Sequence, residues 1–410
     1  FKDGKFVGLA RGLIDFTVTA KYMTAAGLGF RVKKDNDTLG FNIEETKPIA
    51  SELKEKIRTE PETVFGTFHM EEIRPWTPKL ERGQRVDAVL ALAQGPKFNR
   101  EWFAVFIGSL RRVNPNCNVL LFAYSRPEEE ILRLSRKFNV RWMIYSLEQM
   151  VWMAYNGLNR WPIGRFAAFR DYLTQFQDWY EERGSFVFIT DARDVYFQRD
   201  VFSWPHEAYG SPDMYVFGES RRINNCTINK PVLEGLYGKE YVQNHGQEVI
   251  MNVGTILGKS TAVLRYVDYM VGEFQRLHTS LNLPIVDIMA DQGVHMYLIA
   301  NQINEQLGFT MQYMDNDSGE SLVNTMGYAG YHADDLGRLH NRAGHISYVI
   351  HQFDRYPFIN DLLFMQFPIM DERGSLLTIK ELGNAEEEGE DEDSEDEGDD
   401  DDDDDDEGEE

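Results

Sequence analysis

An apolar run that starts at Ser185 ends in two acidic residues, Asp191 and Asp194. Arg193 lies between them. Carboxylates are ligands for Mg²⁺ and Mn²⁺, and a bound cation neutralises the charge of a diphosphate group. The stretch therefore predicts a divalent-cation site that holds a nucleotide diphosphate. As an alternative, both acids only cap the turn that follows and pair with neighbouring arginines.

A histidine late in the chain has the position of a further ligand. If the segment 346–353 is a strand, its alternate side chains share one face, and His351 lies at the end of that face. Neutral imidazole is an acceptable ligand for Mn²⁺. The alternative is a loop histidine whose nitrogens form ordinary hydrogen bonds. His332 and His340 are expected in loops.

Strands that alternate with helices must place these residues. The pattern predicts strands over 86–94, 118–125, 140–146 and 186–191, and helices over 99–113, 127–138 and 164–184. We expect Asn99 to cap the first of these helices and Gly184 to end the last. The alternation is typical of an α/β fold with a mostly parallel, Rossmann-like sheet flanked by helices. Ligands bind beyond the carboxyl ends of such strands, where Asp191 lies.

Other polar residues allow two interpretations from their position alone. Arg165 and Arg170, early in the helix 164–184, could bind a donor phosphate or lie on a solvated helix face. Asp291 starts an apolar-periodic segment and could simply be its N-cap. Gly254, near Asn252, could allow the close approach of a ligand or only relieve packing.

The charge of the chain is very uneven. Its formal net charge is −26, but residues 386–410 contribute 21 Asp or Glu and no Lys or Arg. The remainder has 47 acidic and 42 basic residues, so nucleic-acid binding is not expected. We expect the acidic tail to be disordered and solubilising, with weak calcium binding or docking to a basic partner as the alternative.

The composition predicts three parts. These are an N-terminal extension packed on the core (1–84), one α/β domain (85–380) and the acidic tail (381–410). Only Cys117 and Cys226 are present, which allows one disulfide or two free thiols and no zinc site from that pair alone.

Three Asn-X-Ser/Thr triplets begin at Asn36, Asn225 and Asn316 and slightly favour the secretory pathway. No run of 18 apolar residues predicts a membrane span. The chain starts at Phe1 rather than Met, so we expect a processed or truncated product, which leaves room for a removed signal or an upstream membrane anchor.

Four segments, in order, resemble those of GT-A glycosyltransferases, over roughly residues 85–371. ITDARDVYFQRDVF resembles the acidic DxD element that binds the metal of a nucleotide-sugar donor. MNVGTILGKS resembles the segment that lines the donor sugar, ADQGVHMYLI a helix opening with Asp-Gln, and GHISYVIHQFDRYP a late strand whose His completes the metal shell. The resemblance implies this set of roles: metal ligands Asp191, Asp194 and His351; donor contacts Asp191, Arg165, Arg193, Asn252, Gly254 and Gln292; general base Asp291.

The acidic element departs from the family pattern, because Arg193 occupies the third position and the second acid is Asp194. Residues three apart on a strand point to opposite faces, so both acids reach one ion only if the chain turns directly after Asp191. Otherwise Asp191 holds the ribose while Asp194 alone holds the metal, or Arg193 neutralises the phosphates without a metal.

The resemblance implies a hexosyl- or pentosyltransferase that uses Mn²⁺ or Mg²⁺ and a nucleoside-diphosphate sugar. Its acceptor would be a hydroxyl of a glycan or glycoprotein, and its place the Golgi or another secretory lumen, with a cytosolic form as the alternative. An inverting enzyme needs a base such as Asp291, whereas a retaining one does not. A haloacid-dehalogenase-type phosphohydrolase is disfavoured, because Arg193 stands where that chemistry needs a second Asp. The remaining alternative is a non-catalytic protein that binds calcium or a basic partner through its tail, which deletion of the tail would test.

Overall fold

The computed structural model describes part of the chain: residues 23–24, 30–35, 40–45, 50–59, 75, 84–93, 98–124, 126–145, 147–281, 289–317 and 319–368. Compact packing separates one unit, Phe1–Phe367, from a second, Pro368–Glu410. The predicted acidic tail lies outside the described residues, as does most of the predicted N-terminal extension. The predicted boundaries of the extension, the core and the tail therefore stay predictions.

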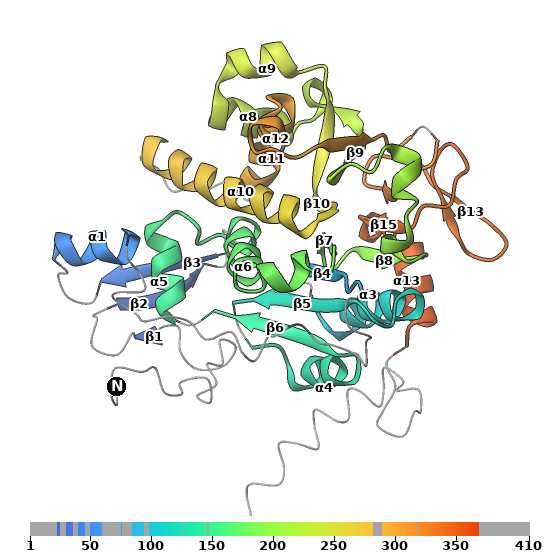
Figure 1. Ribbon diagram of the computed structural model, residues 1–410, viewed down its shortest axis with the longest axis horizontal. Coiled ribbons are helices and arrows are strands. Elements are labelled where there is room, and N and C mark those ends of the chain that lie inside the picture. Colours follow the sequence, from blue (N-terminus) through green and yellow to red (C-terminus); the bar gives the residue numbers. More distant parts are fainter. Residues whose placement is uncertain are drawn as a thin grey trace, which may run out of the picture. The chain divides into compact units, whose positions relative to one another are not determined.

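A seven-stranded sheet is the centre of the first unit (Figure 1). Its strands, in spatial order, are β11 (Met311–Met314), β9 (Met214–Arg222), β10 (Val249–Lys259), β7 (Phe186–Asp191), β4 (Ala88–Leu92), β5 (Asn118–Ala123) and β6 (Val140–Ile144). Only β10 runs antiparallel to its neighbours, and the other pairs are parallel. The predicted α/β fold with a mainly parallel sheet is confirmed.

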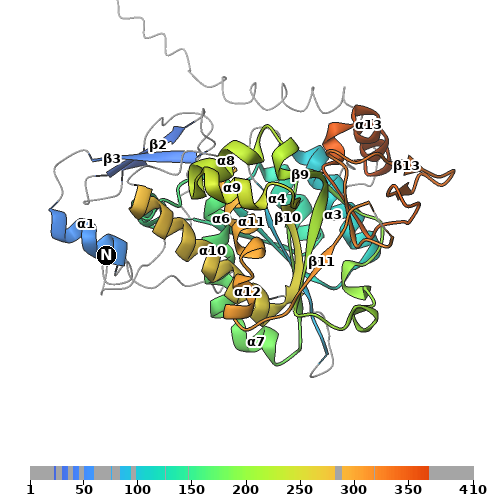
Figure 2. The same cartoon turned by 90° about the horizontal axis from the view of Figure 1, so that it is seen from above.

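Helices cover both faces of this sheet (Figure 2). One face packs against α5 (Leu147–Tyr155), α6 (Trp161–Gln175), α10 (Ser260–Leu281) and α11 (Ala290–Ala300). The other face packs against α3 (Arg100–Val113) and α4 (Glu129–Lys137). Neighbouring residues of β7 alternate between the two cores, Val187 in one and Phe188 in the other, because successive side chains of a strand point to opposite sides.

Local signals mark the starts of two helices, α3 and α6. Asn99 caps α3 as predicted, and its side chain accepts a hydrogen bond from the backbone N–H of Trp102. The predicted helix 164–184 is wrong in extent: α6 starts at Trp161 and stops at Gln175, and a short helix, α7 (Gln177–Glu181), follows. The early start suits Pro162, whose missing N–H costs nothing in a first helical turn.

A second, three-stranded sheet lies in the order β12 (Val323–Thr325), β15 (Val349–His351) and β8 (Val195–Phe197). β15 pairs antiparallel with β8, so that His351 lies opposite Val195. His332 and His340 face each other across a small strand pair, β13 (His332–Ala333) and β14 (Leu339–His340), and are not in irregular loops as predicted.

The remaining elements with defined bounds flank these sheets. They are β1 (Met23–Thr24), β2 (Phe30–Asp35), β3 (Gly40–Glu45), α1 (Ser51–Thr59), α8 (Asn229–Tyr237), α9 (Lys239–His245), α12 (Ile303–Gln306) and α13 (Pro357–Gln366). Among the described residues, no helix is long and apolar enough to cross a membrane.

The structure decides several side-chain questions that the sequence leaves open. Cys117 and Cys226 are both buried and free, so the two-thiol alternative holds. Of the glycosylation triplets, Asn225 is exposed. Asn316 is 1% exposed, and its Nδ2 donates to Ser220 Oγ and to a backbone carbonyl, so a glycan on it is incompatible with this packing. Asn36 lies outside the described residues.

Candidate metal centre

Asp191, Asp194 and His351 meet at the carboxyl end of β7. One ligand atom from each lies within 4.8 Å of the others. Strand β7 ends at Asp191, the chain bends over the next residues, and β8 begins at Val195. This bend is the immediate turn that both acids require to reach one ion. β15 then places His351 against β8, since it pairs with Val195.

The imidazole of His351 lacks the partners that a buried polar ring needs. The residue is 1% exposed, and neither ring nitrogen has a hydrogen-bond partner. Its Nε2 lies 3.5 Å from Asp191 Oδ2 and 3.8 Å from Asp194 Oδ1. Burial lowers the pKa of His351, but the two carboxylates outweigh it and raise the pKa above its usual value. Buried polar atoms are rarely left unpaired, and a cation bound by carboxylate oxygens and an imidazole would give this ring a partner.

Arg165 is not on a solvated helix face. Its side chain is 3% exposed, and it bridges two carboxylates: Nη1 contacts Asp191 Oδ1, and Nη2 lies 2.8 Å from Asp291 Oδ2. Burial raises the pKa of Asp191, but Arg165 and His351 outweigh it and hold the pKa well below its usual value. Most residues of α6 are buried, so a charged residue among them had to find a partner inside the protein. Arg170, by contrast, is half-buried and pairs with its neighbour Asp171.

Asp291 is in the first turn of α11 and is not its N-cap, which is Met289. Both of its oxygens are engaged: Oδ1 accepts from the backbone N–H of Gln292 at 2.9 Å, and Oδ2 accepts from Arg165. Burial raises the pKa of Asp291 to about 6, although Arg165 lowers it in part. Gln292 Oε1 accepts the Val253 backbone N–H at 3.1 Å, so Gln292 connects α11 to β10.

Gly254 has no room for a side chain. A Cβ on this residue would lie 2.6 Å from Asp191 Oδ2 and 2.7 Å from His351 Cε1. Asn252 Oδ1 accepts the backbone N–H of Gly254 at 2.7 Å. The glycine thus permits the close approach that the sequence suggested, but the approaching groups are the metal-centre residues themselves.

Arg193 is paired with acids on both sides. Its Nη1 lies 3.0 Å from Asp354 Oδ2 and its Nη2 lies 3.4 Å from Asp194 Oδ2. The guanidinium also lies over the ring of Trp102. The side chain is 30% exposed, so this charge stays at the rim of the centre.

Two further acids near this centre, Asp354 and Glu219, are not among the predicted site residues. Asp354, three residues after β15 ends, pairs with Arg193 and with Arg355. Glu219, at the end of the apolar part of β9, is 5% exposed and accepts from Asn252 Nδ2 at 3.0 Å. A lone acid directly after the buried run MYVFG was the available signal for Glu219.

The charges around the centre do not balance. Five carboxylates gather here, those of Asp191, Asp194, Glu219, Asp291 and Asp354. Three guanidinium groups pair with them, those of Arg165, Arg193 and Arg355. With every acid ionised and His351 neutral, the acids exceed these three guanidinium groups by two charges, and the attraction of Arg221 to Glu219 offsets part of that excess.

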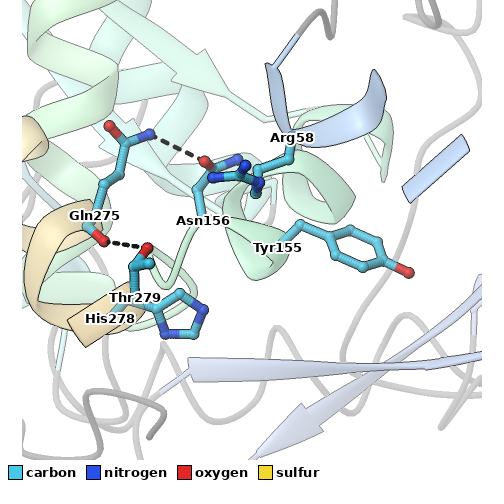
Figure 3. A pocket seen from close by; sticks show the side chains of 6 residues that line it. All are labelled: Arg58, Tyr155, Asn156, Gln275, His278 and Thr279. Atoms are coloured by element: carbon cyan, nitrogen blue, oxygen red, sulfur yellow. Dashed lines mark hydrogen bonds between the residues drawn. The ribbon is translucent and has the colours of Figure 1, made fainter. Parts of the chain in front are cut away.

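A cavity of about 220 Å³ shares no lining residue with this centre (Figure 3). It lies between α1, the end of α5 and α10, and its lining residues are Arg58, Tyr155, Asn156, Gln275, His278 and Thr279. Within it, Gln275 Nε2 donates to Asn156 Oδ1 at 3.1 Å. The metal centre, where two acids meet a buried histidine without hydrogen-bond partners, is the better candidate for chemistry.

Comparisons with known proteins give little beyond this geometry. No family model matches the chain, and no curated protein matches it. Among solved structures, the chain is similar to mouse xyloside xylosyltransferase 1 at 10% sequence identity. The similarity covers 66% of this chain and 98% of that one, with a TM-score of 0.37. At that identity and TM-score it carries no weight for activity, which the geometry of the centre has to decide.

Proposed function

We propose that this chain is a glycosyltransferase that moves a sugar from a nucleoside-diphosphate donor to a hydroxyl of a glycan or glycoprotein. The observation that carries the proposal is the group Asp191, Asp194 and His351, which lies at the carboxyl end of the central strand β7. The strand order reverses between β4 and β7, and α/β sheets bind their ligands at such a switch point.

The donor set suits Mn²⁺ or Mg²⁺. Two carboxylates and an imidazole with two unpartnered nitrogens are acceptable to Mn²⁺ in particular. When bound, such a cation supplies the positive charge that a departing diphosphate needs. Asp191 is the most open of the three, with its side chain 33% exposed, so phosphate oxygens would approach the centre from its side.

In the proposed transfer, the acceptor hydroxyl oxygen forms a bond to the anomeric carbon of the sugar. The bond from that carbon to the diphosphate oxygen breaks, and the hydroxyl proton passes to a base. Arg165 and Arg193 add fixed positive charge beside the leaving diphosphate, Arg165 from the buried side of the centre and Arg193 from its rim.

Asp291 is the proposed general base. Its side chain is 5% exposed, and Gln292 and Arg165 occupy one lone-pair site on each oxygen, so the acceptor hydroxyl has to reach one of the remaining sites. Asp291→Asn separates the two roles: loss of turnover with normal donor binding fits a base, whereas loss of donor binding fits a residue that only positions Arg165.

The acceptor class and a secretory location belong to the same proposal. The ordered motifs of the chain and the exposed Asn225 of one glycosylation triplet support them. Gly254 packs against Asp191 and His351 and Asn252 is 2% exposed, so we propose that this pair acts on the donor through the metal ligands. The sugar itself is for the experiment to name.

The proposal is tested by calorimetric titration of a panel of nucleoside diphosphates into the protein, with Mn²⁺ and with EDTA. We expect one nucleotide to bind in Mn²⁺, to bind at least tenfold more weakly in EDTA, and to lose its metal dependence in Asp194→Ala. Asp213→Asn is the matched control, because Asp213 is a partly exposed acid that pairs with Lys259 outside the centre.

Each outcome has a distinct meaning. If binding depends on the metal, is lost in Asp194→Ala and persists in Asp213→Asn, the donor site is supported. The nucleotide that binds then identifies the nucleobase of the donor. Equal binding in EDTA would contradict a metal-assisted donor site. It would mean that Arg165 and Arg193 neutralise the charge of the diphosphate instead. If no nucleoside diphosphate binds under either condition, the glycosyltransferase proposal is wrong.

A further inference from the structure

Glu219 is a buried carboxylate that none of the motifs includes. It lies on β9, which runs in the same direction as β7, because both pair antiparallel with β10. Its position near the end of β9 places it on the carboxyl edge of the sheet, the edge that carries Asp191. Only 5% of the residue is exposed.

Two hydrogen bonds of Asn252 connect Glu219 to Gly254, which packs against the proposed metal ligands. Asn252 Nδ2 donates to Glu219 Oε1 at 3.0 Å, and Asn252 Oδ1 accepts the N–H of Gly254 at 2.7 Å. The two bonds fix which end of the Asn252 amide is which, because a backbone N–H can only donate and an ionised carboxylate can only accept. Glu219 therefore orients Asn252, and Asn252 holds Gly254 in place.

Gly254 is in turn packed against the proposed ligands. Its missing Cβ would come within 2.6 Å of Asp191 Oδ2 and within 2.7 Å of His351 Cε1. A small displacement of the Gly254 backbone would thus move a carboxylate oxygen and an imidazole that must share one ion. Groups that orient metal ligands in this way commonly set the affinity of a site.

A neutral side chain could accept the hydrogen bond from Asn252 equally well, so the charge of Glu219 needs its own explanation. No ion pair joins Glu219 to a cationic side chain within the described parts of the chain, unlike Asp191 and Asp291. A buried carboxylate without a counter-ion costs stability unless something else compensates its charge. Arg355, Arg221 and a protonated His351 attract the charge of Glu219, although none forms an ion pair with it. A cation in the neighbouring centre would add to that compensation.

We propose that Glu219 is a positioning residue of the cation site, which fixes Gly254 through Asn252 and whose negative charge strengthens the binding of a divalent cation. The proposal rests on the proposed function in one respect, since it requires Asp191, Asp194 and His351 to bind a cation. It adds that the site extends across β10 to β9, beyond the residues that touch the ion.

The test is the affinity of the full chain for Mn²⁺ alone, measured by calorimetry and by the electron paramagnetic resonance of free Mn²⁺. Glu219→Gln keeps the shape and the acceptor oxygen but removes the charge. We expect it to bind Mn²⁺ about tenfold more weakly than the wild type, with an unchanged or higher Tm. A residue that only supports the fold would lower the Tm and leave the affinity of the folded protein unchanged.

Asp87→Asn is the matched control. Asp87 is 7% exposed and also a buried acid, but it precedes β4 and so lies at the opposite edge of the same sheet. Removing its charge should leave the Mn²⁺ affinity within about twofold of the wild-type value, because the distance and the screening weaken its effect on the site. An equal loss in both variants would mean that only the overall charge matters, and the proposal would fail.

The outcomes separate this proposal from the proposed function. If the wild type binds Mn²⁺ and Glu219→Gln binds it as tightly, the role of Glu219 is wrong and the metal centre stands. If the wild type binds no Mn²⁺, the metal centre itself is wrong. Should circular dichroism show Glu219→Gln to be unfolded, Asn252→Ala, which cuts the link and keeps the charge, must weaken binding by about threefold or more for the proposal to survive.

Discussion

The buried acids at the two edges of the central sheet differ in their surroundings. At the amino edge, Asp87 Oδ1 accepts the backbone N–H of Phe186 at 2.8 Å, and Oδ2 accepts from Arg85 at 3.1 Å. At the carboxyl edge, both nitrogens of His351 and one oxygen of Asp354 are buried without a hydrogen-bond partner. Both oxygens of Asp87 thus have partners within the protein, whereas His351 and one oxygen of Asp354 do not.

This difference separates a structural acid from a functional one. Asp87 joins the start of β4 to the start of β7, so its contacts stabilise the register of two parallel strands. The carboxyl-edge acids gather around an unpaired imidazole and leave negative charge in excess. Native proteins leave few buried polar groups unpaired, and those that remain call for a ligand or another stated reason.

The largest expected effect comes from removing the guanidinium that holds the carboxyl edge together. Arg165→Ala leaves Asp191 and Asp291 facing each other without their shared counter-ion. Loss of one partner of a buried ion pair costs about 3–5 kcal/mol of the free energy of unfolding, which urea denaturation measures. Arg170→Ala on the same helix removes a half-exposed pair with Asp171 and should cost at most about 1 kcal/mol. Equal losses in the two variants would contradict the special role of Arg165.

Added Mn²⁺ should stabilise the carboxyl edge and hence the whole domain. A ligand that binds only the folded state at one hundred times its Kd raises the free energy of unfolding by about 2.7 kcal/mol. We expect a higher Tm in Mn²⁺ than in EDTA for the wild type and little change for His351→Ala, which lacks the unpaired imidazole. A Tm that does not respond to Mn²⁺ in the wild type would remove the contrast between the two edges.

A methyl group on Gly254 should damage the same edge by contact. In Gly254→Ala the new Cβ would meet Asp191 Oδ2 and His351 Cε1 closer than atoms normally approach. Overpacking of this kind costs about 1–3 kcal/mol and should also abolish the stabilisation by Mn²⁺. Gly272→Ala is the control, because nothing lies within 4 Å of its Cβ position in α10. That change should be neutral or stabilising by about 0.5–1 kcal/mol, and a loss as large as in Gly254→Ala would refute the steric explanation.

The buried Asp87 at the amino edge should make the free energy of unfolding depend on pH. Burial raises the pKa of Asp87 from 3.8 to about 6, although the Phe186 hydrogen bond and Arg85 lower it in part. A raised folded-state pKa means that the native state binds the proton more tightly. The contribution of Asp87 to stability is therefore complete below its ordinary pKa and is lost as the pH rises through about 6.

Asp87→Asn cannot ionise and isolates this contribution. Between about pH 5 and pH 7.5, the wild type should lose about 1.4 kcal/mol relative to the variant, measured as the difference in their free energies of unfolding. A difference that does not change over this interval would show that Asp87 titrates normally and that its burial costs nothing.

Much of the candidate site could be predicted from the sequence, because its signals are local. An apolar run that ends in an acid, as at Asp191, places that acid at the end of a buried strand. The ordered segments that include Asp291 and His351 indicated further members of one site. The structure brings these residues together, and their roles stay proposals.

The sequence by itself determined the alternation of strands and helices and the edge of the sheet that carries the acids. These follow from side-chain periodicity, which a strand or helix expresses over a few residues. Only the tertiary structure decided that Arg165 is buried between two acids and that Glu219 reaches Asn252. These partners are 26 to 126 residues apart along the chain, and strand order decides whether they meet. Strand order depends on packing over the whole domain, so it cannot be predicted from any short stretch of residues.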